Sequence, residues 1–284
     1  HVGCPQICIF CNQHRMGTEN SVSQTAALPS AQEVRDTIRS YVGNQRQQKF
    51  WEVAFYGGSF SAIPRSVQEE LFKPAQEALA LGLIDGIRCS TRPDALGEEE
   101  ILFLKEHGVS TVEIGCQSMD DFILQVSRRG HTSDDVRGAI KRLQAAGLQV
   151  GVQLLPGLPG ETWQTLVRTA VAITDLQPDF ARIYPVLVVE NTDLADMYRA
   201  GYYQPLSLGL ALRYSVFLKD WLENHGVTVI RTGLQATEDL ENNVVAGPYE
   251  PALGELVENE RWRQRLEATL LDYETHFVQR RGLG

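Results

Sequence analysis

The sequence predicts an α/β fold: a partial, three-quarter TIM-like (βα)6 barrel followed by a C-terminal helical and α+β extension. Short runs rich in branched and aromatic residues alternate with amphipathic helical stretches at intervals of roughly 25 to 35 residues, which is typical of repeated βαβ units. The 284 residues, 43% hydrophobic, suffice for the core of one barrel of usual size. We expect residues 1–190 to form the barrel and residues 191–284 to form an extension packed on it.

In the first half of the chain, helix and strand signals alternate. Ser30 and Glu33 form a capping box that begins a helix. Alternating aromatic and branched residues at 50–56 predict a strand. Pro74 is expected to bend the next helix, because proline removes a helical hydrogen bond. The elements expected here are helices 30–42, 65–81 and 98–107 and strands 50–56, 86–90 and 111–115.

The alternation continues as far as Pro185 and then changes. Gly147 ends a helix, as glycine commonly does. A further barrel strand is expected in front of Cys4, because the chain opens on His1 without a methionine and we expect an N-terminal segment to be missing. The elements expected in this half are helices 120–127, 132–146, 162–176, 207–223 and 251–273 and strands 148–155, 180–184 and 227–231.

Three of the five cysteines lie close together near the start of the chain. Cys4, Cys8 and Cys11 form a C-x3-C-x2-C pattern. Thiolates are soft ligands suited to iron-sulfur clusters, zinc or copper rather than magnesium or calcium. Cys89 and Cys116 stand singly in apolar, strand-like runs, so we expect them to be inert core residues. The pattern therefore predicts a soft-metal site with three protein thiolates.

Polar or glycine-rich segments follow each of the five expected barrel strands. In βα barrels the chemistry lies at the C-terminal ends of the strands. Because parallel strands end at the same rim, we expect these segments to meet beside the cysteines. They are Gly57 and Gly58, residues 90–94, Gln117 and Ser118, Gln153 with residues 156–160, and residues 182–185.

Composition argues against several classes of protein. The formal net charge of -10 is opposite to what a surface that binds nucleic-acid phosphates needs. The local basic pairs Arg128-Arg129 and Arg280-Arg281 are typical of solvated charge. No apolar run reaches the roughly 18 to 20 residues that cross a bilayer, and no signal-peptide pattern opens the chain. We therefore expect a cytoplasmic protein without a membrane partner, and composition does not favour a nucleic-acid partner.

On these motifs the sequence resembles the radical S-adenosylmethionine (SAM) superfamily. The superfamily's signature is a C-x3-C-x2-C loop with an aromatic residue before the last cysteine, here Phe10 before Cys11. The resemblance extends from His1 to about Leu256 and is greatest to the branch with the Elongator catalytic subunit and the oxygen-independent coproporphyrinogen dehydrogenases. The closer match rests on residues 55–60, 90–94, 113–118, 129–132, 155–160 and 182–185.

The resemblance implies a [4Fe-4S] cluster on Cys4, Cys8 and Cys11, with the fourth iron left free to chelate S-adenosyl-L-methionine. It implies reductive cleavage of that cofactor to a 5'-deoxyadenosyl radical, which abstracts hydrogen from a substrate that the sequence does not identify. An electron donor such as flavodoxin or ferredoxin is the partner that this chemistry implies.

The resemblance also implies roles for residues at the strand ends. Gly57 and Gly58, followed in the same turn by Ser59, would let the backbone approach the methionine amino group, because glycine has no Cβ. Arg129 would meet the methionine carboxylate, which a guanidinium fork suits. Tyr184 would lie against the adenine.

Two further positions depart from the pattern of the coproporphyrinogen dehydrogenase branch. Gln117 and Gln153 match cofactor contacts there, but a carboxylate is expected in place of Gln153. Ser90 stands where that branch has a ribose-binding glutamate, so recognition of the ribose must differ. No residue receives a catalytic role, and Glu113 and Glu161 are interpreted as structural polar residues of the rim.

Two alternatives to a stand-alone radical enzyme stay open. A zinc-stabilised, non-catalytic binding module could use the three cysteines with His14 or His1. Elongator-like modification of the tRNA wobble uridine is the second. We place it lower, because we expect neither the acetyltransferase domain of that family nor its basic N-terminal tRNA-binding region here.

Overall fold

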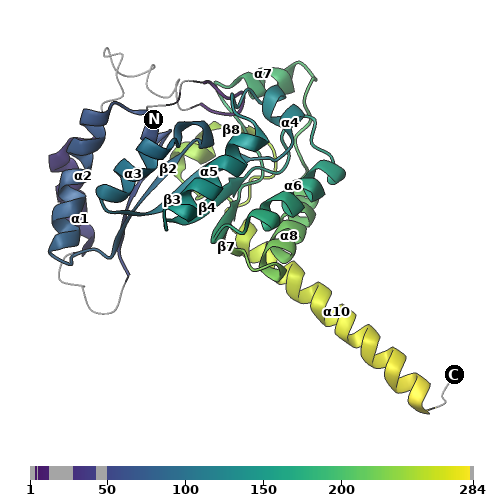
Figure 1. Cartoon of the computed structure of the whole chain (residues 1–284). Coiled ribbons are helices and arrows are strands. Elements are labelled where there is room, and N and C mark those ends of the chain that lie inside the picture. The colour runs from purple at the N-terminus through teal and green to yellow at the C-terminus, as the bar shows by residue number, and fades with distance from the viewer. Residues whose placement is uncertain (1–3, 5, 13–27, 43–49, 282–284) are drawn as a thin grey trace.

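The protein was analysed as a computed structural model that describes residue 4 and residues 6–12, 28–42 and 50–281 (Figure 1). His1 and His14, the two histidines considered as zinc ligands, lie outside the described residues. No helix in the described part is long and apolar enough to cross a membrane.

Six parallel strands form the central sheet in the order β1-β2-β3-β4-β5-β7, which confirms the predicted α/β fold. Five of them are the expected barrel strands. The sixth strand of the sheet is β7, which comes from the predicted extension and pairs with β5, whereas we had expected a sixth strand before Cys4. The strands are β1 (Glu52–Phe55), β2 (Gly86–Thr91), β3 (Val109–Gln117), β4 (Gln149–Leu154), β5 (Phe180–Ile183) and β7 (Thr228–Thr232).

Helices lie against one side of this sheet, and α5 and α8 contact the strands directly (Figure 1). Capping boxes at Thr132 and Thr162 fix the starts of α5 and α6, because each threonine side chain accepts a backbone N–H of the first turn. The helices are α1 (Ala31–Val42), α2 (Arg65–Ala80), α3 (Glu98–Glu106), α4 (Asp121–Val126), α5 (Ser133–Ala145), α6 (Trp163–Leu176), α7 (Asp193–Arg199), α8 (Leu208–Asn224), α9 (Glu238–Asn243) and α10 (Leu253–Arg281).

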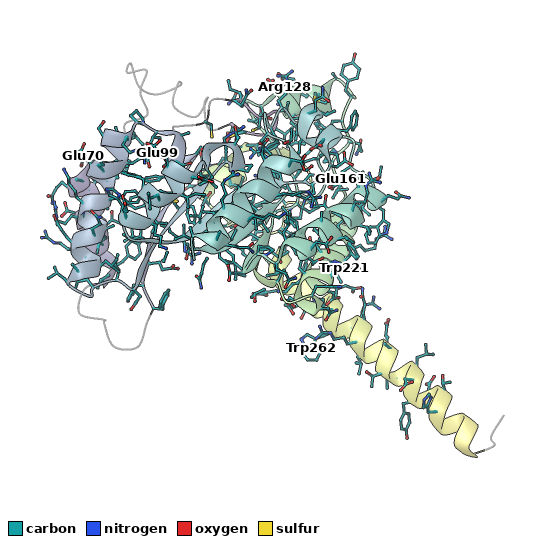
Figure 2. The ribbon with its side chains drawn as sticks, viewed as in Figure 1. Glu70, Glu99, Arg128, Glu161, Trp221 and Trp262 are labelled. Carbon is teal, nitrogen blue, oxygen red and sulfur yellow. The ribbon has the colours of Figure 1, made fainter. Side chains whose placement is uncertain are left out.

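Sequence analysis missed four short elements in the second half of the chain. They are α7, α9 and the antiparallel pair β6 (Val188–Val189) and β8 (Val244–Ala246). The last helix, expected at 251–273, continues to Arg281 and projects from the body as the yellow helix of Figure 1. Trp262 stands near the start of the projecting part (Figure 2).

The main hydrophobic core lies between the sheet and its helices. Alternate side chains of the strands point into it, because successive strand residues face opposite sides. Cys89 of β2 and Cys116 of β3 are among them and are fully buried. Burial raises the pKa of both thiols. The opposite face of the strands carries polar side chains, of which Glu113, Gln153 and Arg182 line a pocket.

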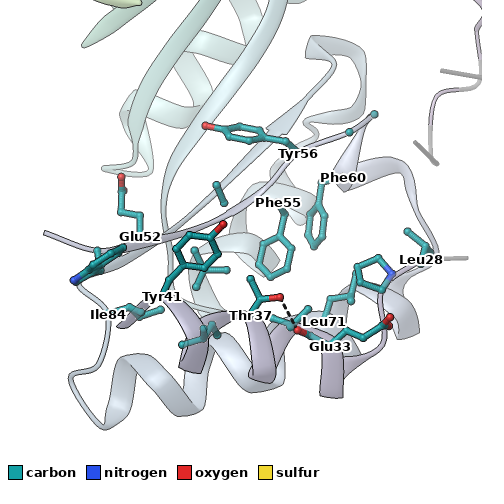
Figure 3. Close-up of a pocket in the computed structure, with 18 of the residues that line it drawn as sticks. Leu28, Glu33, Thr37, Tyr41, Glu52, Phe55, Tyr56, Phe60, Leu71 and Ile84 are labelled. Atoms are coloured by element: carbon teal, nitrogen blue, oxygen red, sulfur yellow. Dashed lines mark hydrogen bonds between the residues drawn. The ribbon is translucent and has the colours of Figure 1, made fainter. Parts of the chain in front are cut away.

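An apolar groove of about 480 Å³ runs between α1 and the edge strand β1 (Figure 3). Phe55 and Phe60 stack in its wall with ring centroids 4.9 Å apart. At the end of β1 the groove shares Tyr56, Gly57 and Gly58 with a second, more polar pocket. The glycine turn therefore separates a hydrophobic space from a polar one.

Candidate active site

The strand ends and the cysteine loop enclose one pocket of about 530 Å³. The expected convergence at one rim is therefore present. Leu234, Asp239 and Asn243, from β7 onward, complete the wall, so the C-terminal segment contributes to the pocket. The residues predicted from the sequence that line it are Cys4, Cys8, Cys11, Gly57, Gly58, Ser90, Gln117, Arg129, Gln153 and Tyr184.

The cysteine loop is held in place by its own backbone and by one apolar side chain. Ile9 is 2% exposed and packs in a small second core with Ile123 and Leu194. Its backbone N–H donates to Ser127 O at 3.3 Å, and its carbonyl accepts from Leu194 N at 2.8 Å. These contacts fix Cys8 and Cys11 on either side of Ile9 at the pocket wall.

In the described part of the chain, no three His, Cys, Asp or Glu side chains surround one point closely enough to hold a single metal ion. The thiolates of an iron-sulfur cluster bind different irons, so they need not approach one another as closely as the ligands of one ion. The chemistry of the three thiols, all on one pocket wall, fits a cluster.

Arg129 is buried between the cysteine loop and the end of β3. Its Nη1 donates to Cys8 Sγ at 3.1 Å, and its Nη2 donates to Gly115 O at 2.7 Å. A Cβ on Gly115 would lie 3.1 Å from Arg129 Nη2, so glycine makes room for the guanidinium there. The buried Nε has no hydrogen-bond partner among the described residues. The Nε donor of Arg129 is therefore left unused by the described residues.

Gln117 ends β3 in an unusual backbone conformation. Its φ of 70° lies in the left-handed region, which non-glycine residues seldom adopt. Its carbonyl accepts from Leu155 N at 3.0 Å, which ties the end of β3 to the end of β4. Its side-chain Oε1 is buried without a hydrogen-bond partner in the described part. The side chain thus offers an unused acceptor at the pocket.

The turn after β1 brings its two glycines, but not its serine, to the pocket wall. Gly57 and Gly58 have φ of 107° and 139°, values that favour glycine. Ser59 is fully buried and does not line the pocket. Its Oγ lies 2.8 Å from Thr91 Oγ1 and accepts from Arg92 N at 3.2 Å. Ser59 therefore joins the turn to β2, because its hydroxyl is used by protein partners.

Beneath the predicted positions lies a charged network that sequence analysis missed. Its centre is Glu113, which is 1% exposed. Arg182 donates to both carboxylate oxygens at 2.7 and 3.0 Å, and Arg88 donates at 3.0 Å. Tyr56 OH also donates to Glu113, and Gln153 Nε2 lies 3.4 Å from Oε2. Side chains from β1 to β5 thus meet at one carboxylate.

The network sets the protonation of its members. Burial by itself raises the pKa of Glu113, but hydrogen bonds from Arg182 and Tyr56 hold it below its usual value. Burial and the neighbouring Glu113 carboxylate raise the pKa of Tyr56 to about 12. Glu113 is therefore ionised and Tyr56 is protonated at neutral pH, so neither is poised to exchange protons there.

Comparison with protein families agrees with this geometry. The model of the radical SAM superfamily matches residues 1–173, and the model of the Radical_SAM C-terminal domain matches residues 178–263. The chain belongs to the radical SAM superfamily. Members of this superfamily are enzymes, and a [4Fe-4S] cluster and S-adenosylmethionine are general to it.

Two relatives are similar in sequence to this radical SAM chain. An uncharacterized protein of Methanocaldococcus jannaschii is 30% identical over 234 residues, which cover 78% of this chain and 69% of the relative. The tRNA uridine(34) acetyltransferase of the same organism is 34% identical over 170 residues, which cover 59% of this chain and 31% of the relative. The chain thus spans less than a third of that acetyltransferase.

Two solved structures share the predicted fold, and the first of them also supports the Elongator-like branch. The archaeal Elp3 of Methanocaldococcus infernus, with residues 1–46 deleted, superposes with a TM-score of 0.70 and is 26% identical. The match covers 83% of this chain and 59% of the Elp3 chain. The coproporphyrinogen III oxidase HemN of Escherichia coli, a radical SAM enzyme, superposes with a TM-score of 0.53 and is 15% identical. The match covers 78% of this chain and 51% of the HemN chain. The second likeness concerns the fold alone.

The radical SAM family assignment explains the cysteine loop but not the charged network. Glu113 had been interpreted as a structural rim residue, and Arg88 had not been singled out. Their signal in the sequence is a charge inside an otherwise apolar strand: Arg88 in β2, Glu113 in β3 and Arg182 in β5. Opposite charges in neighbouring strands of one barrel could have predicted an interior pair.

Proposed function

We propose that the chain is a radical enzyme that binds a [4Fe-4S] cluster through Cys4, Cys8 and Cys11 and S-adenosylmethionine in the pocket beside them. The observation that carries this proposal is that the cysteines and the strand ends line one pocket. When bound, these groups supply a 5'-deoxyadenosyl radical that abstracts hydrogen from the substrate. An electron donor such as flavodoxin or ferredoxin is the proposed partner.

The unused hydrogen-bonding atoms support this proposal. Gln117 Oε1 is a buried acceptor and Arg129 Nε a buried donor, both without partners among the described residues. A zwitterionic amino-acid group, such as the methionine part of the cofactor, supplies a matching donor and acceptor. We assign Gln117 to the amino group and Arg129 to the carboxylate, while Arg129 Nη1 also holds Cys8.

The other pocket residues receive roles from their positions. The backbone at Gly57 and Gly58 admits the close approach of the amino group, because neither glycine carries a Cβ. Tyr184 OH accepts from Arg182 Nη1 at 3.3 Å, which orients the ring that we place against the adenine. Ser90 and Gln153 are proposed to contact the nucleoside. Asp239 and Asn243 are proposed substrate contacts from the C-terminal segment.

Replacing one cysteine tests the proposal. After anaerobic reconstitution, the natural chain should be brown and hold about four irons, and dithionite should drive cleavage of S-adenosylmethionine. Cys8→Ala should abolish both, because a cluster cannot be held by two thiolates. We would measure the iron content, the absorption of the cluster near about 400 nm and the amount of 5'-deoxyadenosine formed.

Cys116→Ala is the matched control, because Cys116 is fully buried in the core and does not line the pocket. It should keep its iron and its cleavage activity. Retention of cleavage by Cys8→Ala would contradict the ligand assignment. One zinc per chain and no iron would instead support the zinc-stabilised binding module.

Modification of the tRNA wobble uridine is the second candidate function. The observation that favours it is the likeness to proteins named tRNA uridine(34) acetyltransferase and to archaeal Elp3. The net charge of -10 opposes it. Filter binding of tRNA at low salt tests it: binding that weakens steeply with salt supports this candidate, and no binding eliminates it for the chain alone.

A further inference from the structure

Helix α10 has two parts with different surroundings. Its first turns pack on the body, where Leu253, Val257 and Arg261 are buried. Arg261 is anchored there by hydrogen bonds to Asp220 at 2.7 Å and Glu223 at 2.6 Å, both on α8. Every residue from 262 to 276 is exposed, and the helix projects away from the body (Figure 1). We call residues 262–276 the arm.

The arm carries an apolar stripe. Trp262, Leu266, Leu270 and Tyr273 are 65%, 61%, 53% and 58% exposed. At about 100° per residue these four side chains fall within a sector of about 80°. Exposed apolar patches of this kind mark interaction sites. The stripe is therefore a candidate docking surface.

Charged side chains flank the stripe in a definite pattern. The same helical geometry places Arg265 and Asp272 on one side of the stripe and Arg263 and Glu274 on the other. On both sides the basic residue is nearer the body and the acidic residue is nearer the tip. Within the chain, Arg263 pairs with Glu260 and Glu267. Arg265 also lies 3.5 Å from Asp220, and Asp272 lies 3.7 Å from His276, but exposed pairs of this type contribute little and can exchange.

We propose that the arm pairs with the arm of a second copy of this chain in an antiparallel two-helix interface. In an antiparallel pair, equivalent flanks face each other. Arg265 then faces the partner's Asp272, and Arg263 faces the partner's Glu274. Both pairs have the same midpoint, between residues 268 and 269, and Leu266 and Leu270 are symmetric about residue 268.

One two-fold axis thus satisfies the charges and the apolar stripe together. A parallel pair would bring the basic ends together and the acidic ends together, so the charges select the antiparallel arrangement. Each copy contributes two aromatic and two leucine side chains. Aromatic residues bury about 150 to 250 Å² each, so the pair hides on the order of 1,000 Å², the size of a small specific interface.

The proposal is tested on the full chain by sedimentation equilibrium at micromolar concentrations. The natural chain should have twice the 31.7 kDa mass of one copy. Leu266→Glu with Leu270→Glu should raise the dissociation constant about 100-fold or more, since it places charges in the centre of the stripe. Leu271→Glu is the matched control: Leu271 is 67% exposed on the opposite side of the arm, so this variant should remain dimeric.

Charge reversal tests the orientation. Asp272→Arg with Glu274→Arg should weaken the dimer, and adding Arg263→Glu with Arg265→Glu should restore it. All these residues are exposed, so circular dichroism should show an unchanged body. A monomeric natural chain at all concentrations, a dimer that survives the double leucine change, or an equal loss of the dimer in Leu271→Glu would each overturn the proposal.

Discussion

Glu113 is the centre of a group of polar side chains in the interior of the barrel. TIM-barrel interiors are dominated by branched apolar side chains, whereas here one carboxylate accepts hydrogen bonds from Tyr56, Arg88 and Arg182. Arg88 is also paired with Glu52, so the arginines and glutamates balance each other. The network holds Arg182, and through it Tyr184, at the floor of the pocket.

Removing this carboxylate should be costly. Glu113→Gln leaves the partly buried Arg182 without its counter-charge, whereas Arg88 keeps Glu52. Breaking a buried pair costs up to about 3 to 5 kcal/mol of unfolding free energy. Glu77→Gln is the control, because Glu77 accepts a similar guanidinium fork from Arg35 but is 57% exposed, and such pairs contribute at most about 1 kcal/mol. Urea unfolding of both variants measures the difference. Equal losses would show that burial does not matter here.

Sequence reasoning identified residues whose chemistry is unusual by itself. Cysteines at short spacing and a glycine pair after a strand stand out, and the structure brings both to one pocket. The hydrogen-bond partners of Ser59 and Glu113 could not be predicted, because they lie far along the chain. Ser59 hydrogen-bonds to Thr91, which lies 32 residues further along the chain. Glu113 accepts a hydrogen bond from Arg182, 69 residues further along. A single sequence does not record such pairs.

At the scale of elements, strong local signals predicted well and weak ones did not. The helices α5 and α6 have capping boxes and an apolar face, and their bounds agree with the sequence to within a few residues. The strand β6 has two residues and β8 has three, too few for any periodicity. They form only because they pair with each other.

A close approach between β4 and β5 gives a prediction for these strands. A Cβ on Gly151 would lie 2.2 and 2.3 Å from two carbons of the Phe180 ring, which fills the barrel floor. Gly151→Ala should therefore cost about 1 to 3 kcal/mol of unfolding free energy, as overpacking does.

Gly209→Ala is the control for Gly151→Ala. Gly209 lies in the first turn of α8, where an added Cβ meets nothing within 4 Å. Alanine favours helices by up to about 1 kcal/mol over glycine, so this variant should be neutral or more stable. Thermal unfolding compares the two. A destabilised Gly209→Ala, or an unaffected Gly151→Ala, would contradict the packing argument.

At the scale of the whole molecule, the sheet and the main core continue across the division predicted at residue 190. The strand β7 extends the barrel sheet, and Leu218, Leu222 and Val229 belong to the main core together with residues of the first half. The sequence indicated the strand at 227–231 but not its place in the sheet, because pairing with β5 is a long-range event. The division into a barrel core and a packed extension at residue 190 stays a prediction.

Two buried thiols in that core allow the rate of its opening to be measured. Cys89 and Cys116 have no exposed surface, and burial keeps both protonated, so an alkylating reagent reaches them only when the core opens. If the core is one cooperative unit, both should be modified at the same rate in native buffer, which pulsed alkylation with mass spectrometry measures. Different rates would reveal that β2 and β3 open separately.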